Sequence, residues 1–260
     1  MARICIVGDI HGCIETLKAL LETLKLTPED TFISLGDLFH KRSGYGHQII
    51  QILKALNCNV KFIFANHEDK HYRWYIKTKE EREQMTWVED FETEGLIQED
   101  IDWLLDGYLY YSFTVNNQKY ICIHGGIAPE HTELNDELLI KDLFGLTSKP
   151  RKSLEKILRT RYITPEGESV KDIHSITQYD TYWAEIYNGR FGTALFGHQP
   201  FLNSIGPRIF PHAIGLDTGC VHGGALTALI LEEGEPVKSI SVKNPVSYCP
   251  AVFSPHRFPI

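Results

Sequence analysis

Apolar runs and amphipathic stretches alternate along the first part of the chain. The runs at 4–7, 31–35 and 60–64 are short and rich in β-branched or aromatic residues, which predicts strands. Between them, residues 13–25 and 45–56 carry apolar side chains at helical spacing with polar residues in between, which predicts amphipathic helices. This alternation of strands and helices indicates an α/β fold that begins with a parallel sheet and right-handed crossovers.

The pattern changes after the third strand. Residues 68–108 are charged, aromatic and helical in spacing, although their acidic run at 89–94 is typical of a solvated face. Residues 109–115 and 119–123 predict a hairpin that begins a second sheet. Residues 145–189 are polar, and we expect a cap-like, substrate-facing insertion there. The last elements are strands at 193–196, 225–232 and 237–242, followed by an irregular Pro-rich tail at 245–260.

Length and composition favour one globular domain. A chain of 260 residues can form one large α/β domain over 1–260, with two smaller domains as the alternative. Hydrophobic residues make up 43% of the chain, but they form no run near the roughly 18 residues needed to cross a bilayer. Met1-Ala2-Arg3 leads directly into a strand rather than an export signal, so we expect a cytoplasmic protein without a membrane partner.

Cysteine usage and charge agree with that compartment. The six cysteines form no CxxC pair, and Cys5 and Cys122 lie in apolar strands, so we expect free, buried thiols rather than disulfides or a zinc site. The formal net charge of −8 opposes non-specific binding of nucleic acid, which needs many Lys and Arg residues. An anionic substrate would therefore need a locally positive site, and metal ions can supply one.

Metal-ligand residues recur where the predicted strands end. Asp9 and His11 follow the first strand; two positions apart in an extended segment, they point the same way and can bind one cation. Taken alone, Asp9 could equally be the N-cap of the next helix. The arrangement recurs at four further strand ends, in Gly36-Asp37, Asn66-His67-Glu68, His124-Gly125-Gly126 and Gly197-His198. Strand ends meet in one crevice in layered α/β folds, so the five sets predict a shared metal site.

Taken in order, these five motifs resemble those of the calcineurin-like metallophosphoesterases. They are GDIHG at 8–12, GDL at 36–38, NHE at 66–68, HGG at 124–126 and GH at 197–198. Within that family the chain is similar to the branch of bacterial and phage serine/threonine protein phosphatases and symmetrical diadenosine tetraphosphatases, and residues 215–220 and 223–226 extend the similarity. The resemblance implies a four-layer α-β-β-α metallophosphoesterase sandwich, in which helices flank two mixed sheets.

The resemblance also implies two divalent metal ions, with Mn²⁺ as the first expectation and Fe, Zn, Ni or Co as alternatives. Carried over motif by motif, the implied ligands are Asp9 and His11 for one metal, Asp37 as the bridge, and Asn66, His124 and His198 for the other. A hydroxide that bridges the metals would attack phosphorus in line. His67 would protonate the leaving group, because an unperturbed histidine titrates near physiological pH.

The family also places an arginine on the phosphate, from a segment between the HGG and GH motifs. Arg159 lies in the matching segment with Arg161 close behind, and Arg190 is a third candidate. The family's GDxxDRG pattern supplies a further arginine, but here Lys41 stands at its position. Arg42 is the candidate to take over if the loop holds one extra residue, since a lysine cannot grip phosphate bidentately.

Two further departures from the family pattern concern the residues around the catalytic histidine. His40 stands where the family has the Asp that orients this histidine; it can hold the tautomer of an imidazole but cannot stabilise its cation. Diadenosine tetraphosphatases resemble the chain in lacking that Asp, so the loss favours a dinucleoside polyphosphate over a phosphoprotein as the phosphorylated substrate. Ala65 replaces the glycine before Asn66, which costs only a methyl group if the backbone there has negative φ.

Together these observations predict a dinuclear metal-dependent hydrolase of phosphoric esters or anhydrides, like either the serine/threonine protein phosphatases or the diadenosine tetraphosphatases. A metal-binding regulatory protein without catalysis is the alternative suggested by His40, Lys41 and Ala65, but the six ligands and His67 remain. A nucleic-acid end-processing phosphatase would use the same metals but needs a basic groove, which the net negative charge disfavours. Asp217 is expected either to support a metal-binding histidine or to hold a turn.

Overall fold

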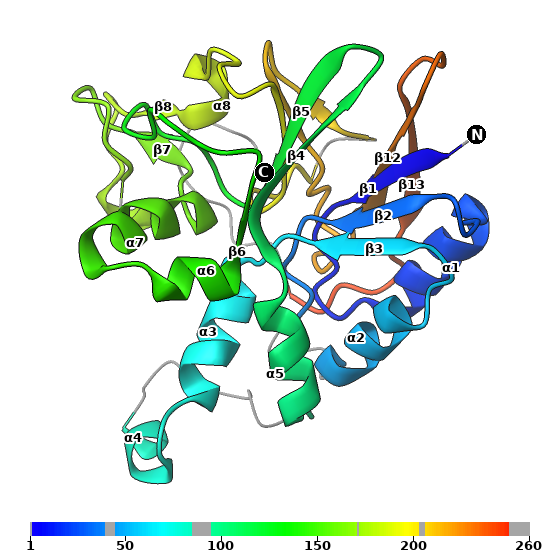
Figure 1. Ribbon diagram of the computed structural model, residues 1–260, viewed down its shortest axis with the longest axis horizontal. Helices are drawn as coiled ribbons and strands as arrows, with labels where there is room; N and C mark the ends of the chain where they lie inside the picture. The colour runs from blue at the N-terminus through cyan, green and yellow to red at the C-terminus, as the bar shows by residue number, and fades with distance from the viewer. Residues whose placement is uncertain (1, 40–44, 85–94, 171, 203–205, 250–260) are drawn as a thin grey trace.

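Two mixed β-sheets form the centre of the computed structural model, which describes residues 2–39, 45–84, 95–170, 172–202 and 206–249 (Figure 1). The first sheet has the strand order β13-β12-β1-β2-β3. Its strands are β1 (Arg3–Val7), β2 (Thr31–Ser34), β3 (Asn59–Phe62), β12 (Ala225–Glu232) and β13 (Lys238–Lys243). β1, β2 and β3 are parallel, as the alternation of strands and helices predicts, and β12 runs antiparallel to both of its neighbours.

The second sheet has the strand order β10-β11-β9-β5-β4-β6. Its strands are β4 (Tyr108–Val115), β5 (Gln118–Ile123), β6 (Glu137–Leu139), β9 (Thr193–Phe196), β10 (Arg208–Ile209) and β11 (Ala213–Gly215). The predicted hairpin is present: antiparallel β4 and β5 turn at Asn116 and Asn117, whose φ angles of 52° and 59° suit a type I′ turn. β9 is parallel to both β5 and β11, which makes this sheet mixed as well. A bridge between Ile63 and Tyr108 connects the two sheets.

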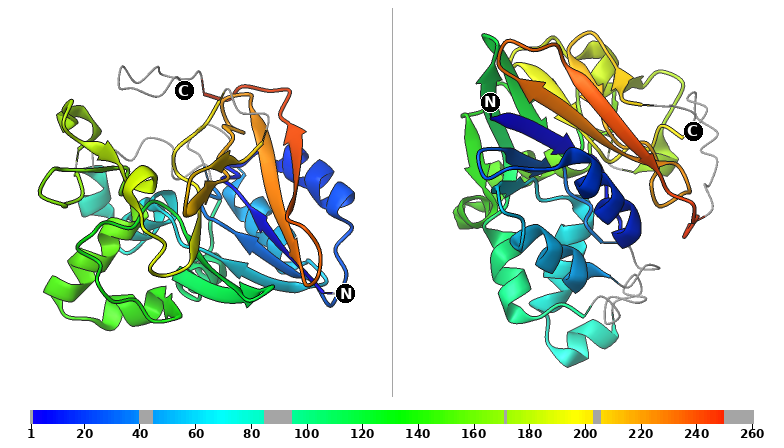
Figure 2. Two further views of the ribbon diagram at one scale, coloured as in Figure 1. Left: turned by 90° about the horizontal axis from the view of Figure 1, so that it is seen from above. Right: turned by 90° about the vertical axis from the view of Figure 1, so that its right-hand side faces the viewer.

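Helices cover the outer faces of the sheets, so the expected arrangement of two mixed sheets flanked by helices is confirmed (Figures 1 and 2). α1 (Ile14–Leu24) and α2 (Gly46–Lys54) lie on the first sheet, and α3 (Asn66–Tyr75), α4 (Lys79–Glu83) and α5 (Gln98–Leu105) follow β3. Beside the second sheet lie α6 (Ile140–Gly145), α7 (Ser148–Glu155) and α8 (Trp183–Ile186). The helix predicted over 45–56 is α2, which begins and ends within that range.

In residues 145–189, where an insertion was expected, the described part of the chain forms short elements only. Besides α7 and α8 they are the 3₁₀ helices η2 (Lys156–Leu158) and η3 (Ile173–Ser175) and the antiparallel pair of β7 (Tyr162–Ile163) and β8 (Thr181–Tyr182). In the left view of Figure 2 this yellow-green segment lies at the opposite end of the molecule from β12 and β13. Its role as a substrate-facing cap stays a prediction.

Two layers of apolar side chains hold the sheets and helices together. In β1, Ile6 belongs to the cluster between the two sheets, whereas Cys5 and Val7 belong to the cluster that includes the buried faces of α1 and α2. The cluster between the sheets is completed by Ile33, Leu35, Ile63, Val115, Tyr120, Cys122, Leu195, Leu216, Leu229 and Leu231. Both faces of β1 are therefore buried, which explains why residues 4–7 are apolar without interruption.

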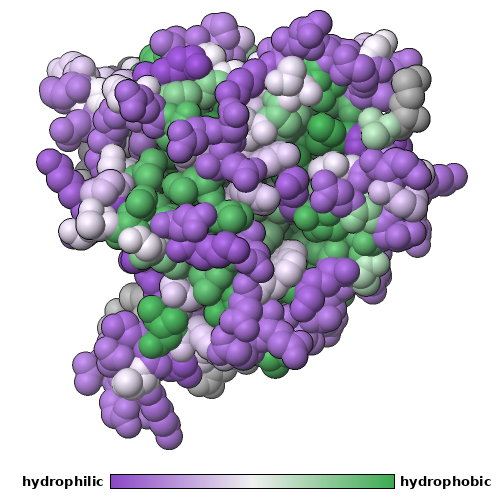
Figure 3. All heavy atoms as spheres, in the orientation of Figure 1, coloured by the Kyte–Doolittle hydropathy of each residue, from purple (hydrophilic) through white to green (hydrophobic). Residues whose placement is uncertain are grey.

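The surface and the cysteines agree with the composition. Hydrophilic side chains cover most of the face shown in Figure 3, and hydrophobic ones show mainly in its hollows. None of the described helices is long and apolar enough to span a bilayer. None of the six cysteines forms a disulfide, as expected; four are buried, and Cys58 and Cys249 are partly exposed. The acidic run at 89–94 and residues 250–260 of the tail lie outside the described residues, and the single domain over 1–260 stays a prediction.

An ion pair fixes the start of β1 against the turn before β2. The buried carboxylate of Asp30 accepts hydrogen bonds from the Arg3 side chain, from the Arg3 backbone N–H (2.9 Å) and from the Thr27 N–H (2.8 Å). Burial opposes ionisation of Asp30, but the bonds from Arg3 and Thr27 outweigh it and lower the pKa to about 2. Because the pKa is depressed in the folded state, this group stabilises the fold above its unfolded pKa, and the contribution is lost as the pH falls through 2.

Asp30→Asn is expected to lower the free energy of unfolding by about 2 kcal/mol at pH 7. The loss should be clearly smaller at pH 2, because the wild-type carboxylate begins to protonate there. Urea unfolding at both pH values measures the effect. The matched control is Asp106→Asn, which removes an exposed ion pair with Lys141 and should cost much less than Asp30→Asn. Equal losses at the two pH values for Asp30→Asn would attribute the effect to packing rather than to charge.

Candidate metal centre

Asp9 lies in the loop after β1 and faces the segment after β9. Its Oδ2 accepts a 2.9 Å hydrogen bond from the backbone N–H of His198, whereas its Oδ1 has no hydrogen-bond partner among the described residues. A Cβ atom on Gly197 would lie only 2.0 Å from Asp9 Oδ1, so glycine is required for the two loops to approach this closely. The close approach leaves a carboxylate oxygen of Asp9 buried without a partner among the described residues, which is costly unless a cation binds there.

Two histidines contact backbone carbonyl oxygens through Nδ1, the ring nitrogen that points away from Asp37. His11 Nδ1 lies 2.9 Å from the Phe39 carbonyl oxygen, and His124 Nδ1 lies 2.8 Å from the Leu35 carbonyl oxygen. A proton on Nδ1 satisfies each contact and leaves a lone pair on Nε2, which is the usual arrangement of a metal-binding imidazole. The Nε2 atoms lie 3.6 Å (His11) and 3.3 Å (His124) from Asp37 Oδ2.

Asp37 belongs to two groups of possible metal ligands. One consists of His11, Asp37 and His67, and the other of Asp37, His124 and His198; within each group the ligand atoms lie within 4.8 Å of one another. The backbone N–H of His67 donates to Asp37 Oδ1 (3.1 Å), and Oδ2 faces the two histidine Nε2 atoms. A carboxylate shared in this way has the position that a bridging ligand of two metal ions needs.

A positive charge would satisfy several contacts in this centre. His124 Nε2 lies 2.9 Å from Asn66 Oδ1, and with the proton on Nδ1 both of these atoms are acceptors. The buried Nε2 of His198 has no hydrogen-bond partner among the residues that the structure describes. Burial and neighbouring carboxylates raise the pKa of Asp9. A cation between these groups would pair the acceptors and neutralise the carboxylates, so the donors fit divalent metal ions.

The pKa of the shared carboxylate is shifted in the opposite direction. Burial acts against ionisation of Asp37, but the positive charge that His124, His67 and His11 carry when protonated outweighs it and holds the pKa well below its usual range. Burial and the nearby Arg161 guanidinium lower the pKa of His198, which keeps that imidazole neutral. An ionised carboxylate and a neutral imidazole are the forms in which these side chains bind metals.

The backbone is strained at three residues of the centre. His11, Asp37 and His198 have φ angles of 47°, 47° and 68°, in the left-handed region that is unfavourable for residues with a Cβ atom. A backbone hydrogen bond from the His11 N–H to the Asp37 carbonyl oxygen (2.7 Å) ties two of the strained turns together. Strain of this kind gathers at functional sites, and its occurrence at three candidate ligands supports a shared function for them.

Glu68 belongs to the NHE motif, and the structure gives it the role of a buried anchor, which was not predicted from the sequence. Its Oε2 accepts hydrogen bonds from the N–H groups of Asp37 (3.0 Å) and Ala65 (3.1 Å), and its Oε1 accepts one from Leu38 (2.8 Å). These bonds fix the turn that carries Asp37 against the first turn of α3. Burial and the neighbouring Asp37 raise the pKa of Glu68 to about 8. The signal in the sequence was its place at the third residue of a helix, from which a glutamate can cap the N-terminus.

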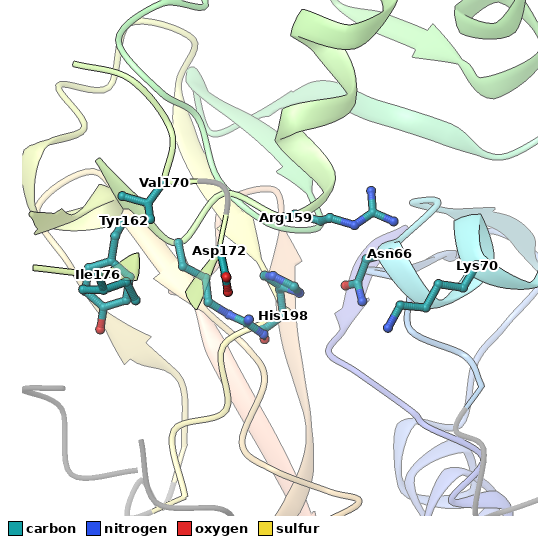
Figure 4. Close-up of a pocket in the computed structure, with 9 residues that line it drawn as sticks. Asn66, Lys70, Arg159, Tyr162, Val170, Asp172, Ile176 and His198 are labelled. Carbon is teal, nitrogen blue, oxygen red and sulfur yellow. The ribbon is translucent and has the colours of Figure 1, made fainter. Parts of the chain in front are cut away.

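A cavity of about 290 Å³ opens beside the candidate ligands (Figure 4). Its lining residues are Asn66, Lys70, Arg159, Arg161, Tyr162, Val170, Asp172, Ile176 and His198. In Figure 4, Lys70 and Arg159 face Tyr162 and Ile176 across the cavity, with His198 between them. The cavity therefore has a cationic wall and an apolar wall, which suits a phosphate group that is attached to an organic group.

Both arginines expected from the 145–189 segment line this cavity. Arg161 Nη2 donates a 2.7 Å hydrogen bond to the carbonyl oxygen of His198, and its buried Nε has no hydrogen-bond partner among the described residues. Arg159 pairs with the buried Asp69, which also accepts a 2.9 Å hydrogen bond from Arg73. Asp69 thus fixes the Arg159 guanidinium while 40% of the arginine side chain stays exposed. Both guanidinium groups can donate to an anion in the cavity.

The HGG motif brings these arginines to the centre. The N–H groups of Gly125 and Gly126 donate to the Ile157 carbonyl oxygen (3.0 and 3.1 Å), so the segment before Arg159 packs directly on the end of β5. A Cβ atom on Gly125 would come within 2.5 Å of that carbonyl oxygen and 2.9 Å of the Arg159 nitrogen. A larger residue at this position would therefore displace Arg159 from the cavity.

Lys70 and Asp69 also belong to this site and were not predicted. Lys70 follows Asn66 by four residues on α3, so the two side chains lie on the same face of the helix, and both line the cavity. Asp69 holds Arg159 from the same helix. The helical spacing from Asn66 was the available signal, but the sequence alone did not say which face of α3 looks into the site.

The remaining candidates fall elsewhere. Residues 40–42, including the expected Arg42, lie outside the described residues. Arg190 does not line the cavity; its Nη2 donates to two backbone carbonyl oxygens, at 2.8 and 3.3 Å. Asp217 Oδ1 accepts a 3.0 Å hydrogen bond from the Gly219 N–H, so it holds a turn, which was one of its two expected roles.

In the comparison with known proteins, one family model matches most of the chain. The family model for calcineurin-like phosphoesterases matches residues 2–202, a range that contains every candidate metal ligand. An asymmetrical bis(5′-nucleosyl)-tetraphosphatase, PrpE of Geobacillus sp. (strain WCH70), is 26% identical over 96% of this chain and 98% of its own length. A symmetrical bis(5′-nucleosyl)-tetraphosphatase of Xanthomonas axonopodis pv. citri is also 26% identical, over 97% of this chain and 90% of its own length.

Solved structures share the fold. A proposed diadenosine tetraphosphatase superposes with a TM-score of 0.65 at 22% identity, over 92% of this chain and 93% of its own. A serine/threonine phosphatase of Saccharomyces cerevisiae with similarity to human PP5 superposes with a TM-score of 0.53 at 14% identity, over 98% of this chain and 82% of its own. At these identities both superpositions bear on the fold alone.

Proposed function

The chain belongs to the calcineurin-like phosphoesterase family, and from this premise we propose that it is a metal-dependent hydrolase of the bis(5′-nucleosyl)-tetraphosphatase type, which cleaves a dinucleoside polyphosphate. The observation that carries the proposal is the Asp37 carboxylate, which two groups of possible metal ligands share beside a cationic cavity. Similarity along nearly the whole chain to relatives of the asymmetrical and symmetrical types supports this substrate over a phosphoprotein.

Two divalent cations would be held by the residues of the metal centre. The ligands in this assignment are Asp9 and His11 for one cation, Asp37 for both, and Asn66, His124 and His198 for the other. When bound, the cations supply positive charge to the phosphoryl oxygens and lower the pKa of water toward neutrality. Mn²⁺ is the expected metal, and Fe, Zn, Ni or Co would suit the same nitrogen and oxygen donors.

The protein's own side chains would bind and orient the phosphate. Arg161, whose Nε has no described partner, and Arg159, which Asp69 fixes, would donate to the nonbridging oxygens of the scissile phosphate. Lys70 would add a third positive charge from α3. These groups would stabilise the negative charge on the equatorial oxygens in the transition state. His67 would transfer a proton to the leaving oxygen.

The apolar wall of the cavity supports a nucleotide substrate. Tyr162, Val170 and Ile176 offer an aromatic ring and two aliphatic side chains next to the phosphate-binding groups. A nucleoside attached to the scissile phosphate would bury apolar surface against them, whereas a phosphate without an organic group would leave this wall unused.

Hydrolysis by the full chain, stripped of metal and reloaded with Mn²⁺, tests the proposal. The substrates are diadenosine tetraphosphate, a phosphoserine peptide and 4-nitrophenyl phosphate, and we expect kcat/KM for the tetraphosphate to exceed that for the peptide by at least about tenfold. Chromatography identifies the bond that breaks, because symmetrical cleavage gives two ADP and asymmetrical cleavage gives AMP and ATP. Preference for the peptide would make the protein a phosphoprotein phosphatase, and no turnover with both metals bound would favour the regulatory alternative.

A further inference from the structure

A second cavity, of about 320 Å³, opens next to the first. Its lining residues are Lys152, Glu155, Lys156, Arg159, Thr160, Ser169 and Val170. Arg159 and Val170 line both cavities, so the two adjoin at these side chains. We propose that the second cavity binds the distal phosphates of a polyphosphate whose scissile phosphate lies in the first, with Lys152 as the main contact; this inference rests on the proposed function.

Cationic residues outnumber carboxylates among the residues that line the second cavity. Lys152, Lys156 and Arg159 contribute three cations, against the single carboxylate of Glu155. That carboxylate is already bound by Arg151, whose Nε lies 2.8 Å from Glu155 Oε1. An excess of cations around a cavity is informative here, because the whole chain carries a formal net charge of −8. The second cavity can therefore attract an anion that most of the surface would repel.

Lys152 is the cation in this cavity that is most available to a ligand. Lys156 is held by Glu130, whose carboxylate oxygens lie 2.8 and 3.0 Å from its Nζ, and Arg159 is held by Asp69. Lys152 is exposed and forms no ion pair with the residues that the structure describes. A lysine acts on phosphate as a point charge, so it can contact a flexible chain at more than one place.

The polar groups deeper in the cavity are already satisfied. Thr160 Oγ1 bonds to the Lys156 carbonyl oxygen and to Ser169 Oγ, each at 2.9 Å. Ser169 Oγ carries one proton, which it donates either to Thr160 Oγ1 or to Glu130 (3.3 Å). These bonds give the cavity a fixed floor, and they leave its cations as the groups that a ligand can reach.

Because Arg159 lines both cavities, the length of the substrate decides whether it reaches the second one. A phosphate monoester beside His198 ends in the first cavity, whereas a polyphosphate chain continues past Arg159 toward Lys152 on α7. Each further phosphate brings at least one negative charge to the second cavity. Binding through Lys152 should therefore favour long polyphosphates over monoesters, which would make the second cavity a determinant of substrate length.

The first test compares two substrates of different length in the Mn²⁺-loaded full chain. We expect Lys152→Ala to lower the ratio of kcat/KM for diadenosine tetraphosphate to kcat/KM for 4-nitrophenyl phosphate by about fivefold, and Lys152→Glu by more. The matched control is Lys149→Ala, which removes an exposed lysine of the same helix that lines neither cavity and should leave the ratio unchanged.

A binding measurement tests the role of the second cavity independently of the proposed function. Calorimetry on the Mn²⁺-loaded chain would use an analogue of diadenosine tetraphosphate in which methylene groups replace the bridging oxygens, so that it cannot be hydrolysed. Weaker binding to Lys152→Ala, by about fivefold, supports the second cavity even if no turnover is seen, in which case only the proposed function fails. Unchanged binding and an unchanged substrate ratio would overturn the inference while leaving the proposed function intact. Absence of both binding and turnover in the wild type would contradict both.

Discussion

Asp37→Asn is expected to lower kcat/KM by more than about a hundredfold and to reduce the bound metal from two ions per chain to one or none. Asp37 Oδ2 lies within 3.6 Å of the Nε2 atoms of both His11 and His124, so the same carboxylate would serve two cations. An amide carries no charge and has a single oxygen, and therefore cannot replace a bridging carboxylate. Metal analysis and hydrolysis of 4-nitrophenyl phosphate measure the two effects.

The substitution is suited to the backbone at this position. The φ angle of Asp37 is 47°, and asparagine is among the residues that adopt this left-handed conformation most readily. The Asn oxygen can still accept from the His67 N–H, and the hydrogen bond to the Glu68 carboxylate uses only the backbone N–H of residue 37. We therefore expect the melting temperature to change much less than the activity.

Asp136→Asn is the matched control for this substitution. Asp136 is an exposed aspartate whose partner is the Lys119 ammonium at 2.7 Å, and it lines neither cavity. Its loss should leave metal content and kcat/KM unchanged within error, because exposed ion pairs contribute little. Two bound metal ions and full activity in Asp37→Asn would mean that the carboxylate does not bridge the cations and that the ligand assignment is wrong.

The local sequence pattern was sufficient to predict the strands and helices, but not which strands pair with one another. Residues 4–7 are apolar throughout because both faces of β1 are buried, and this predicted a strand inside a layered α/β fold. The apolar runs at 109–115 and 119–123 likewise predicted the hairpin of β4 and β5. The pairing of β1 with β12 joins residues more than two hundred positions apart, and nothing in either segment encodes that choice. It depends on the whole chain.

The candidate site was likewise predicted from the sequence only in part. The metal-ligand residues at strand ends predicted that Asp9, Asp37 and His124 lie close together, because strand ends in this fold meet at one crevice. The role of Glu68 and the presence of Lys70 were not predicted, because both depend on which face of α3 turns inward, and packing rather than spacing decides this. The second cavity was equally hidden, since it forms only when α7, η2 and the segment before η3 come together.

His67→Asn is expected to lower kcat for phenyl phosphate by about a hundredfold or more and to leave the metal content unchanged. The His67 ring lies edge-on to the His11 ring, with 5.0 Å between centroids, and its backbone N–H donates to Asp37 Oδ1. Asparagine keeps the backbone contact but cannot give up a proton to a leaving oxygen at neutral pH. The control is His174→Asn, which changes an exposed histidine outside both cavities.

A second leaving group separates the two roles that the geometry allows for His67. His67 also belongs to the group with His11 and Asp37 whose ligand atoms lie within 4.8 Å of one another, so it could bind a metal instead of donating a proton. Protonation matters greatly for phenol, whose pKa is about 10 like that of tyrosine, and little for 4-nitrophenol, which leaves readily as the anion. A loss confined to phenyl phosphate, with two metals bound, therefore identifies the proton donor. Equal losses on both substrates together with a missing metal ion would make His67 a ligand and leave protonation to solvent.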